Sequence, residues 1–328
     1  MQSFGSLDSL HIPWKGTIRQ WNTIPRSLFP SCNAKGEVFD CSGHFLFQLE
    51  AKQQLGSGTF GIIDAFQRKG EDGSKLVAMK RNSHPSIDLC LEALFQWKLH
   101  QALTDYGIQS SIPKVYDIFT YKPTGDIWFT MEAFAPNLLS KWCATHLAST
   151  PSLFPLFMLQ IALVLEVLEN ALHIDHRDLK VNNLLVVDEP ITMDVTWKGK
   201  PRTLQFPFRI VIVDFGFACI QRLLDLREGD GLPPLDPCPK VGRDMFQVLV
   251  SLWSIGTIRG CLEAVWGAWV REKLQNAGAS VEVNCLQLAE SSSCLDWMYT
   301  TTDCASFSAP LCAPYRIIEE CLGAIERG

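Results

Sequence analysis

The chain has 328 residues, of which 47% are hydrophobic, with a net charge of −6 and a pI near 5.7. A chain of this length and composition can bury a large core, which we expect to be divided between two lobes. The acidic balance provides no electrostatic basis for binding nucleic acid or a membrane surface.

Twelve cysteines are scattered along the chain without a C-x-x-C pair. Zinc clusters need closer pairs of ligands, so this spacing does not favour a zinc site. Residues 1–14 contain no basic region followed by an apolar run, and we therefore expect no signal peptide. We interpret the cysteines as reduced thiols in a cytosol-like compartment, with disulfides in the C-terminal part as the alternative.

Residues 1–44 form an N-terminal extension that could pack on the next domain or be mobile. A strand-like run, 45–55, follows it and leads into Gly-Ser-Gly-Thr-Phe-Gly at 56–61. The backbone amides of such a loop can approach phosphate oxygens because glycine has no Cβ, although the glycines alone are equally compatible with an ordinary turn. A dinucleotide-binding fold needs a helix directly after the glycines, but a β-rich run follows here, so we reject that fold.

The next strand ends in Val-Ala-Met-Lys at 77–80, after a turn at 71–74. Apolar side chains three to four positions apart then predict a helix over 87–104. Glu92 lies beside this apolar stripe. Asp88 lies at the start of the helix, where its side chain more readily caps the first turn.

Two strands are predicted at 115–121 and 127–134, joined by the turn sequence Lys-Pro-Thr-Gly-Asp. Residues 153–172 are strongly apolar and approach the length of a membrane span. Glu166 and Glu169 would be costly in lipid, so we predict a long buried helix instead.

The most specific motifs follow this helix. His-Arg-Asp-Leu-Lys-Val-Asn-Asn occupies 176–183, and Asp-Phe-Gly occupies 214–216 after an apolar strand. Together with the glycine-rich loop and Lys80, they resemble the catalytic motifs of eukaryotic-type protein kinases. The resemblance covers residues 45–328.

The resemblance implies an α+β, bilobal protein kinase fold with a small β-rich N-lobe at 45–134 and a larger, mainly helical C-lobe at 135–328. It also implies that ATP lies between an apolar sandwich, the glycine-rich loop and the hinge that follows the gatekeeper Met131. For each apolar residue taken alone, ordinary core packing is the better explanation. The implied ATP-binding residues are Leu55, Gly56, Ser57, Gly58, Thr59, Phe60, Gly61, Ile63, Ala78, Lys80, Met131, Glu132, Phe134 and Leu185.

In such a kinase, Lys80 would hold the α- and β-phosphates and pair with a carboxylate on the next helix. We predict Glu92 as this partner, with Asp88 as the alternative. Four residues after Glu92, kinases usually have an apolar residue, whereas this chain has Gln96. That difference leaves the register of the helix open.

The catalytic loop implies four further roles. Asp178 would act as general base toward the substrate hydroxyl, and Lys180 would stabilise the charge of the transferring phosphoryl group. Asn183 and Asp214 would bind Mg²⁺, because amide and carboxylate oxygens suit this hard cation.

Two departures from the usual kinase pattern lie after the catalytic loop. Residues 188–208 contain two alternating stretches that predict an inserted hairpin, and similar insertions occur in divergent kinases of large DNA viruses. The activation segment from Asp214 to Arg243 contains no Ser, Thr or Tyr and no Ala-Pro-Glu motif. Asp244 is expected to brace the catalytic loop.

A permanent anion could replace a phosphate as the partner of Arg177 in the catalytic loop. Four acidic residues of the activation segment are candidates, although an exposed loop face is the better explanation for most of them. They are Asp225, Glu228, Asp230 and Asp236.

These motifs predict a protein serine/threonine kinase that transfers the ATP γ-phosphoryl group to a protein substrate. Lys180, two residues after Asp178, is typical of the Ser/Thr group. A pseudokinase scaffold and a kinase of small molecules are the alternatives, and a scaffold would not need Lys80, Asp178, Asn183 and Asp214 together. We expect a cytoplasmic protein, or one of the host cytoplasm or nucleus if viral, with no nucleic-acid or membrane partner.

Overall fold

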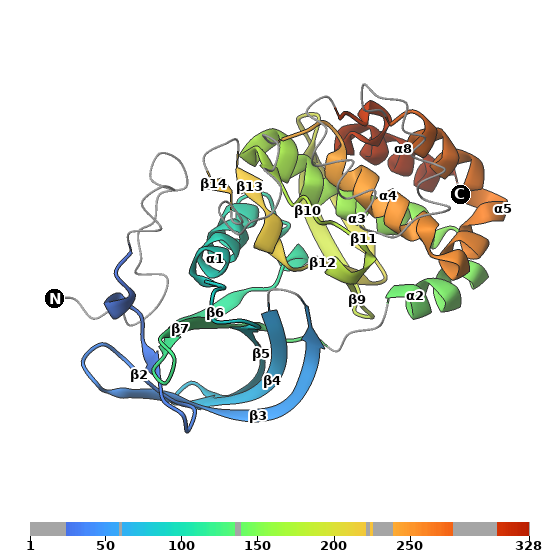
Figure 1. Ribbon diagram of the computed structural model, residues 1–328. Coiled ribbons are helices and arrows are strands. Elements are labelled where there is room, and N and C mark those ends of the chain that lie inside the picture. The colour runs from blue at the N-terminus through green and yellow to red at the C-terminus, as the bar shows by residue number, and fades with distance from the viewer. Residues whose placement is uncertain are drawn as a thin grey trace. The chain divides into compact units, whose positions relative to one another are not determined.

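The computed structural model describes residues 24–58, 61–134, 139–220, 224–225, 239–277 and 307–327. The chain divides into two compact units, both drawn in Figure 1. Unit 1 comprises Met1–Ala102 and Ile112–Ala135, and unit 2 comprises Leu103–Ser111 and Pro136–Gly328. Strands dominate the described part of unit 1 and helices dominate that of unit 2, which confirms the predicted α+β class.

Within the described part of unit 1, seven strands form a closed barrel in the order β1-β2-β3-β4-β5-β7-β6. Neighbouring strands are antiparallel except β1 and β6, which are parallel. The strands are β1 (Ser31–Cys32), β2 (Glu37–Phe39), β3 (Phe45–Ser57), β4 (Gly61–Gly70), β5 (Gly73–Asn82), β6 (Val115–Tyr121) and β7 (Asp126–Glu132).

Residues before Phe45 close this barrel, a role that the sequence did not predict. Cys32 in β1 pairs with Tyr121 in β6, and Val38 in β2 pairs with Phe47 in β3. Closure removes the exposed edges that an open sheet would leave. The buried cluster at this end of the barrel combines side chains from both parts of the chain: Cys32, Val38, Phe47, Leu49, Val77, Met79 and Phe119.

The helix α1 spans Cys90–Thr104, close to the predicted range. The Asp88 carboxylate accepts a hydrogen bond from the Cys90 amide at 3.0 Å and so caps the start of the helix, as predicted. The side chains of Leu94, Phe95 and Leu99 are fully buried.

In unit 2, helix α3 (Leu153–Glu166) continues as a wider turn, η6 (Val167–Leu172), and packs along α8 (Pro314–Arg327). Helix α4 (Arg243–Ser254) is followed by α5 (Gly256–Gln275), and the chain bends by 105° between them. The short helix α2 (Leu139–Trp142) precedes α3.

Among the described residues, Leu153–Leu172 is the single helical stretch that alone is long and apolar enough to cross a membrane. The bent pair of α4 and α5 meets the same criteria only when the two helices are taken together. In the fold, 67% of the most apolar window of Leu153–Leu172 is buried, as is common for the core helix of a folded domain.

Short strands connect the helices of unit 2. Strand β9 (Leu184–Val187) pairs with β12 (Arg209–Ile212), and β8 (Ile174–Asp175) pairs with β13 (Cys219–Ile220), which also pairs with β14 (Leu224–Asp225). The β9–β12 pair places the end of the catalytic loop next to the Asp-Phe-Gly sequence.

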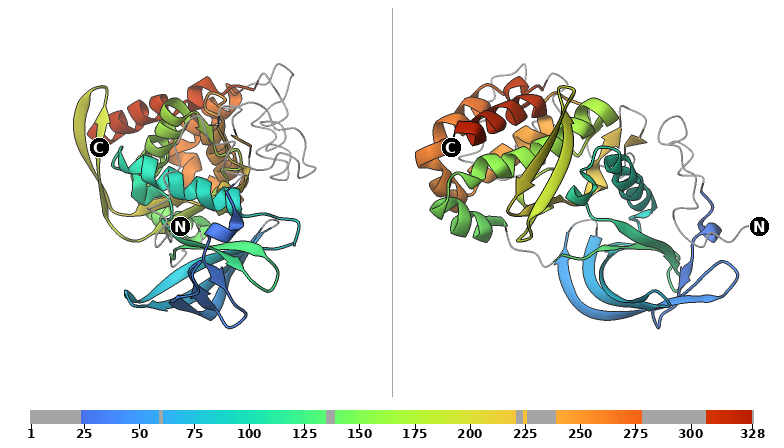
Figure 2. Two further views of the ribbon diagram at one scale, coloured as in Figure 1. Left: turned by 90° about the vertical axis from the view of Figure 1, so that its left-hand side faces the viewer. Right: turned by 180° about the vertical axis from the view of Figure 1, so that it is seen from behind.

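Strands β10 (Ile191–Trp197) and β11 (Lys200–Phe206) form an antiparallel hairpin in the region where the sequence predicts an insertion. Figure 2 shows it in yellow-green along one side of unit 2, beside α8. Lys198 at its tip forms an ion pair with Glu319 of α8. The inward side chain of Met193 is fully buried, so the hairpin is part of the fold of unit 2.

Most described cysteines agree with the expectation of reduced thiols, but one does not. The described cysteines that form no disulfide are Cys32, Cys41, Cys90, Cys143, Cys261, Cys312 and Cys321. Cys219 in β13 is disulfide-bonded, so the expectation is wrong for this residue. Spacing along the chain did not reveal the bond, because pairing of cysteines depends on distance in space.

Candidate active site

The glycine-rich loop of unit 1 connects β3 to β4. The Gly58 amide donates to the Gly61 carbonyl at 2.8 Å and closes the turn, while Thr59 and Phe60 lie outside the described residues. A Cβ on Gly56 would meet no described atom within 4 Å. Packing among the described residues therefore does not require a glycine at position 56. Close approach of a phosphate to the backbone would require one.

Gly61 has a different reason to be glycine. A Cβ at this position would lie 2.7 Å from Cε of Lys80, which is nearer than side-chain atoms can approach. Strand pairing explains the contact, because Ile63 of β4 lies opposite Lys80 of β5. The last glycine of the loop thus makes room for the lysine side chain.

Lys80 forms a buried ion pair with Glu92 of α1. The two side chains are 6% and 4% exposed. Asp88, the alternative partner, instead binds Arg26 at 2.7 Å and caps α1. The structure therefore brings together Lys80 and the carboxylate that the sequence favoured.

Several predicted adenine contacts lie on neighbouring strands of unit 1. Ala78 pairs with Met131 across β5 and β7, while Leu55 and Ile63 are half-buried near the ends of β3 and β4 that flank the loop. The Glu132 amide donates to the Lys114 carbonyl at 2.9 Å, so this amide is already engaged within unit 1. Phe134 follows β7 and is half-buried.

Gln96 occupies the position where an apolar residue was expected. Its amide nitrogen donates to the Pro113 carbonyl at 3.0 Å and lies 3.6 Å from Sδ of Met131. The side chain is 2% exposed, so a hydrogen-bonded amide fills this part of the core. The sequence left the register of α1 open because Gln96 is polar. The structure shows that Gln96 can be buried in the same register that pairs Glu92 with Lys80.

In unit 2, two predicted catalytic residues and one predicted magnesium ligand contact one another. Nζ of Lys180 lies 2.8 and 2.9 Å from the two carboxylate oxygens of Asp178. The Asn183 side-chain amide donates to the Asp178 carbonyl at 2.7 Å and to its carboxylate at 3.1 Å. These bonds hold the Asp178 carboxylate from two sides.

Asp244 of α4 braces the start of the catalytic loop, as predicted. Its carboxylate accepts the amides of His176 at 2.6 Å and Arg177 at 2.8 Å. Burial and the nearby Asp175 carboxylate raise the pKa of Asp244 to about 7. Asp175 itself forms a fully buried ion pair with Arg243.

Neither Asp175 nor Arg243 was recognised from the sequence. The two residues are 68 positions apart. Asp175 directly precedes the catalytic-loop motif and Arg243 directly precedes Asp244, but neither belongs to a recognised motif. The sequence did contain a signal: Asp175 interrupts an apolar strand, and Arg243 begins a helix that is buried. Buried charges are usually paired, so these two residues could have been predicted to need partners.

The β9–β12 pair brings the two predicted magnesium ligands close in the fold. The Val213 amide donates to the Asn183 carbonyl at 3.0 Å, and Asp214 follows directly. Asp214 has φ 64° and ψ 70°, a left-handed conformation that is unfavourable for a residue with a Cβ. Such strain is common at functional sites.

His176 supports this segment. One of its ring nitrogens lies 3.0 Å from the Val213 carbonyl, and its ring centroid is 4.9 Å from that of Phe215. Burial lowers the pKa of His176, which favours the neutral ring in this packed position. Leu185 lies on β9 opposite Val211 and is half-buried.

The residues present fit Mg²⁺ only as a partly hydrated ion. Among the described residues, no cluster of three or more His, Cys, Asp or Glu side chains could hold a metal. Mg²⁺ commonly takes one or two protein ligands and completes its shell with water and phosphate oxygens. Because the Asn183 amide nitrogen faces Asp178, its amide oxygen is the atom left for a cation.

The proposed acidic partners of Arg177 lie largely beyond the described residues. Glu228, Asp230 and Asp236 are outside them, and only the backbone of Asp225 is described, in β14. Nε of Arg177 donates to the Phe217 carbonyl at 2.8 Å. Pairing of Arg177 with a permanent anion stays a prediction.

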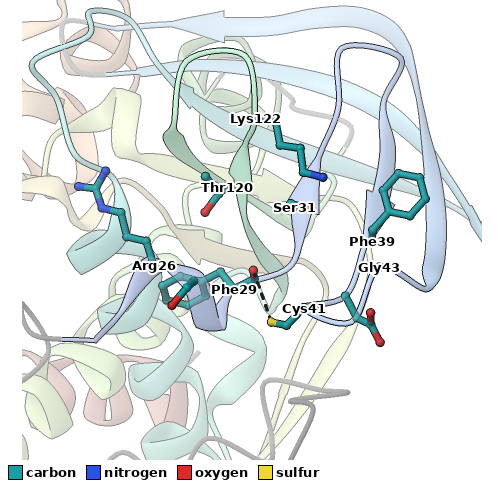
Figure 3. A pocket seen from close by; sticks show the side chains of 10 residues that line it. Arg26, Phe29, Ser31, Phe39, Cys41, Gly43, Thr120 and Lys122 are labelled. Atoms are coloured by element: carbon teal, nitrogen blue, oxygen red, sulfur yellow. Dashed lines mark hydrogen bonds between the residues drawn. The ribbon is translucent and has the colours of Figure 1, made fainter. Parts of the chain in front are cut away.

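A separate hollow of about 600 Å³ lies on unit 1, where the β1–β2 segment meets β6 (Figure 3). Lys122 and Arg26 are at its sides, and Phe29, Phe39 and Cys41 form much of its wall. None of the predicted nucleotide or catalytic residues lines it, so it is not the site that the motifs identify.

A family model described as the protein kinase domain matches residues 49–280, which is more than half of the chain. A search of curated proteins found no match. The match includes every residue that the sequence assigned to ATP, catalysis or Mg²⁺. The chain therefore belongs to the protein kinase family.

Proposed function

We propose that this protein is an active serine/threonine kinase that transfers the γ-phosphoryl group of ATP to a protein hydroxyl. The observation that carries the proposal is the contact set of Asp178, Lys180 and Asn183 in unit 2. A scaffold without catalytic turnover would have no need to keep both the Lys180 amine and the Asn183 amide hydrogen-bonded to Asp178.

Each group would have one role. Asp178 would accept the hydrogen bond of the substrate hydroxyl and take its proton as the new P–O bond forms and the bond from the γ-phosphorus to ADP breaks. Lys180, which is 29% exposed, could move from Asp178 to the transferring phosphoryl group and stabilise its charge. In unit 1, the ion pair with Glu92 would orient Lys80 toward the α- and β-phosphates.

Asn183 and Asp214 would hold Mg²⁺, which would neutralise charge on the ATP phosphates. The proposed class of substrate rests on Lys180, which stands two residues after Asp178 as in the Ser/Thr group. We also propose a cytoplasmic location, because seven of the eight described cysteines form no disulfide, which suits a reducing compartment.

The test is phosphorylation of a positional peptide library and of small-molecule alcohols with radiolabelled ATP. We expect label on Ser- or Thr-containing peptides. Label only on tyrosine or only on small molecules would refute the proposed substrate class, and no transfer to any acceptor would support the scaffold alternative.

The matched control is Asp178→Asn, which keeps the shape of the side chain and removes its charge. We expect turnover to fall by a factor of about 10² to 10⁴, the usual contribution of a general base, without loss of the folded state. Near-normal turnover by this variant would contradict the assignment of Asp178.

A further inference from the structure

A row of polar side chains on α4 holds the backbone of the catalytic loop. Asp244, Gln247 and Ser251 are three and four positions apart, so they lie on one face of the helix. Asp244 binds the amides of His176 and Arg177, as described above. Gln247 and Ser251 continue the row along the loop, and Ser251 Oγ accepts the Val181 amide at 3.1 Å.

Gln247 makes two hydrogen bonds that lie on either side of Asp178. Its amide oxygen accepts the Leu179 amide at 3.0 Å, and its amide nitrogen donates to the Arg177 carbonyl at 2.8 Å. The side chain is fully buried, with an exposed fraction of 0%. In a buried setting, such bonds have no competition from water, and loss of either would leave a backbone group unsatisfied.

Asp244 cannot perform this role. It accepts amides from His176 and Arg177, which both precede Asp178, and a carboxylate offers no donor to the Arg177 carbonyl. A glutamine provides one donor and one acceptor at the end of the same side chain. The peptide groups before and after Asp178 are therefore fixed together by Gln247.

We propose that Gln247 is a positioning residue for phosphoryl transfer, which sets the direction of the Asp178 carboxylate by fixing both flanking peptide groups. The inference rests on the proposed function. Small displacements of a catalytic group have large effects on rate, whereas ATP binding does not require Asp178 to point at a hydroxyl. Gln247 should therefore affect kcat far more than the binding of ATP.

The main variant is Gln247→Met, which has similar volume and makes neither hydrogen bond. We expect kcat to fall about 10- to 100-fold, while the Kd of a fluorescent ATP analogue changes little. Hydrogen exchange measured on the peptide that contains Leu179 should become faster. Ser254→Ala is the matched control on the same helix, because among the described residues the Ser254 hydroxyl donates only to the Ser251 carbonyl, within α4. It should leave all three quantities unchanged.

A second variant, Gln247→Glu, keeps the test decisive if the methionine variant does not fold. Protonated glutamate has one donor and one acceptor and can make both bonds, whereas the carboxylate cannot donate to the Arg177 carbonyl. Its kcat, divided by that of the unsubstituted protein at each pH, should rise as the pH falls. The charged and titratable groups around this position are His176, Asp178, Lys180 and Asp244, and the ratio removes the part of the pH dependence that the two proteins have in common.

The outcomes separate the inference from the proposed function. Absence of turnover by the unsubstituted protein would refute the proposed function and, with it, a positioning role in transfer. Normal kcat in Gln247→Met, or faster exchange without a change in kcat, would overturn the inference alone. Equal losses of kcat and of ATP affinity would also overturn it, because they would indicate a general structural role.

Discussion

At the scale of single residues, the candidate site depends on charges that are buried and paired. Lys80 and Glu92 are almost completely excluded from water, and neither alone could be buried at reasonable cost. Arg243 and Asp175 form a second such pair, next to the start of the catalytic loop. Removal of one partner leaves an uncompensated charge, so these pairs make strong predictions about stability.

We expect Lys80→Met to reduce the free energy of unfolding by about 3–5 kcal/mol, because it strands the Glu92 carboxylate. The double variant Lys80→Met/Glu92→Gln should recover part of this loss, since no buried charge remains. Both variants should be catalytically impaired. Urea unfolding and initial rates provide the two measurements.

Asp88→Asn is the control for this pair. It retains a capping side chain and removes one exposed ion pair, so it should change stability by less than about 1 kcal/mol. If the loss of unfolding free energy in the double variant equals the sum of the losses in Lys80→Met and Glu92→Gln alone, the two side chains are not coupled.

Glu169 makes a prediction about pH. Burial is the main cause that raises its pKa to about 8, and the carboxylates of Asp175, Asp244 and Glu166 add to the effect. The folded protein therefore binds a proton that the unfolded chain releases near its ordinary pKa of 4.5. Stability from this group is present below that pKa and is lost as the pH rises toward 8.

Glu169→Gln should remove this pH dependence while keeping an oxygen that accepts the Gly242 amide. At about pH 9 the variant should be more stable than the unsubstituted protein by at least about 1.4 kcal/mol, the value of one pKa unit. At about pH 4 the two should be nearly equal. A variant that is less stable at alkaline pH would show that the Glu169 carboxylate is ionised and favourable in the fold.

At the scale of elements, short strands before Phe45 complete the barrel of unit 1. Val38 in β2 is fully buried against Phe47 and Phe119, although its strand has only three residues. Pairing of β1 with β6 joins segments nearly ninety residues apart, so local propensity cannot specify it.

We expect Val38→Ala to lower the free energy of unfolding by about 2 kcal/mol, because it removes buried apolar volume. Leu76→Ala is the control on β5, where the side chain is 55% exposed, and it should cost less than about 0.5 kcal/mol. Equal effects of the two substitutions would mean that β2 does not pack in the barrel in solution.

At the scale of the whole molecule, the activation segment suggests how activity is controlled. No Ser, Thr or Tyr occurs between Asp214 and Arg243. Phosphorylation of that segment, which orders it in many kinases by pairing with arginine, is therefore chemically unavailable.

We predict that the protein is active as synthesised. After complete dephosphorylation, checked by intact mass, the recombinant protein should keep its initial rate at saturating ATP. A many-fold loss of rate that a second kinase restores would contradict this prediction.

The sequence by itself determined the family and the identities of the candidate catalytic residues. Asp178, Lys180 and Asn183 lie within six positions, so a contiguous motif is sufficient to recognise them and their contacts are local. The strand order from the glycine-rich loop to Glu132 and the helix over 153–172 also followed from hydrophobic patterning and turn residues. The choice of Glu92 over Asp88 was correct as a pairing, although helix spacing alone left both open.

Only the tertiary structure decided the features that join distant parts of the chain. Closure of the barrel by β1, the Asp175–Arg243 pair and the Gln247 bonds on either side of Asp178 all link positions far apart in sequence. Each of these features is a pairing of polar groups, in the backbone or in side chains, that come together only when the chain is folded. The physical reason is that a hydrogen bond or ion pair is set by distance in space and by exclusion of water, and neither is encoded in the local pattern of one segment.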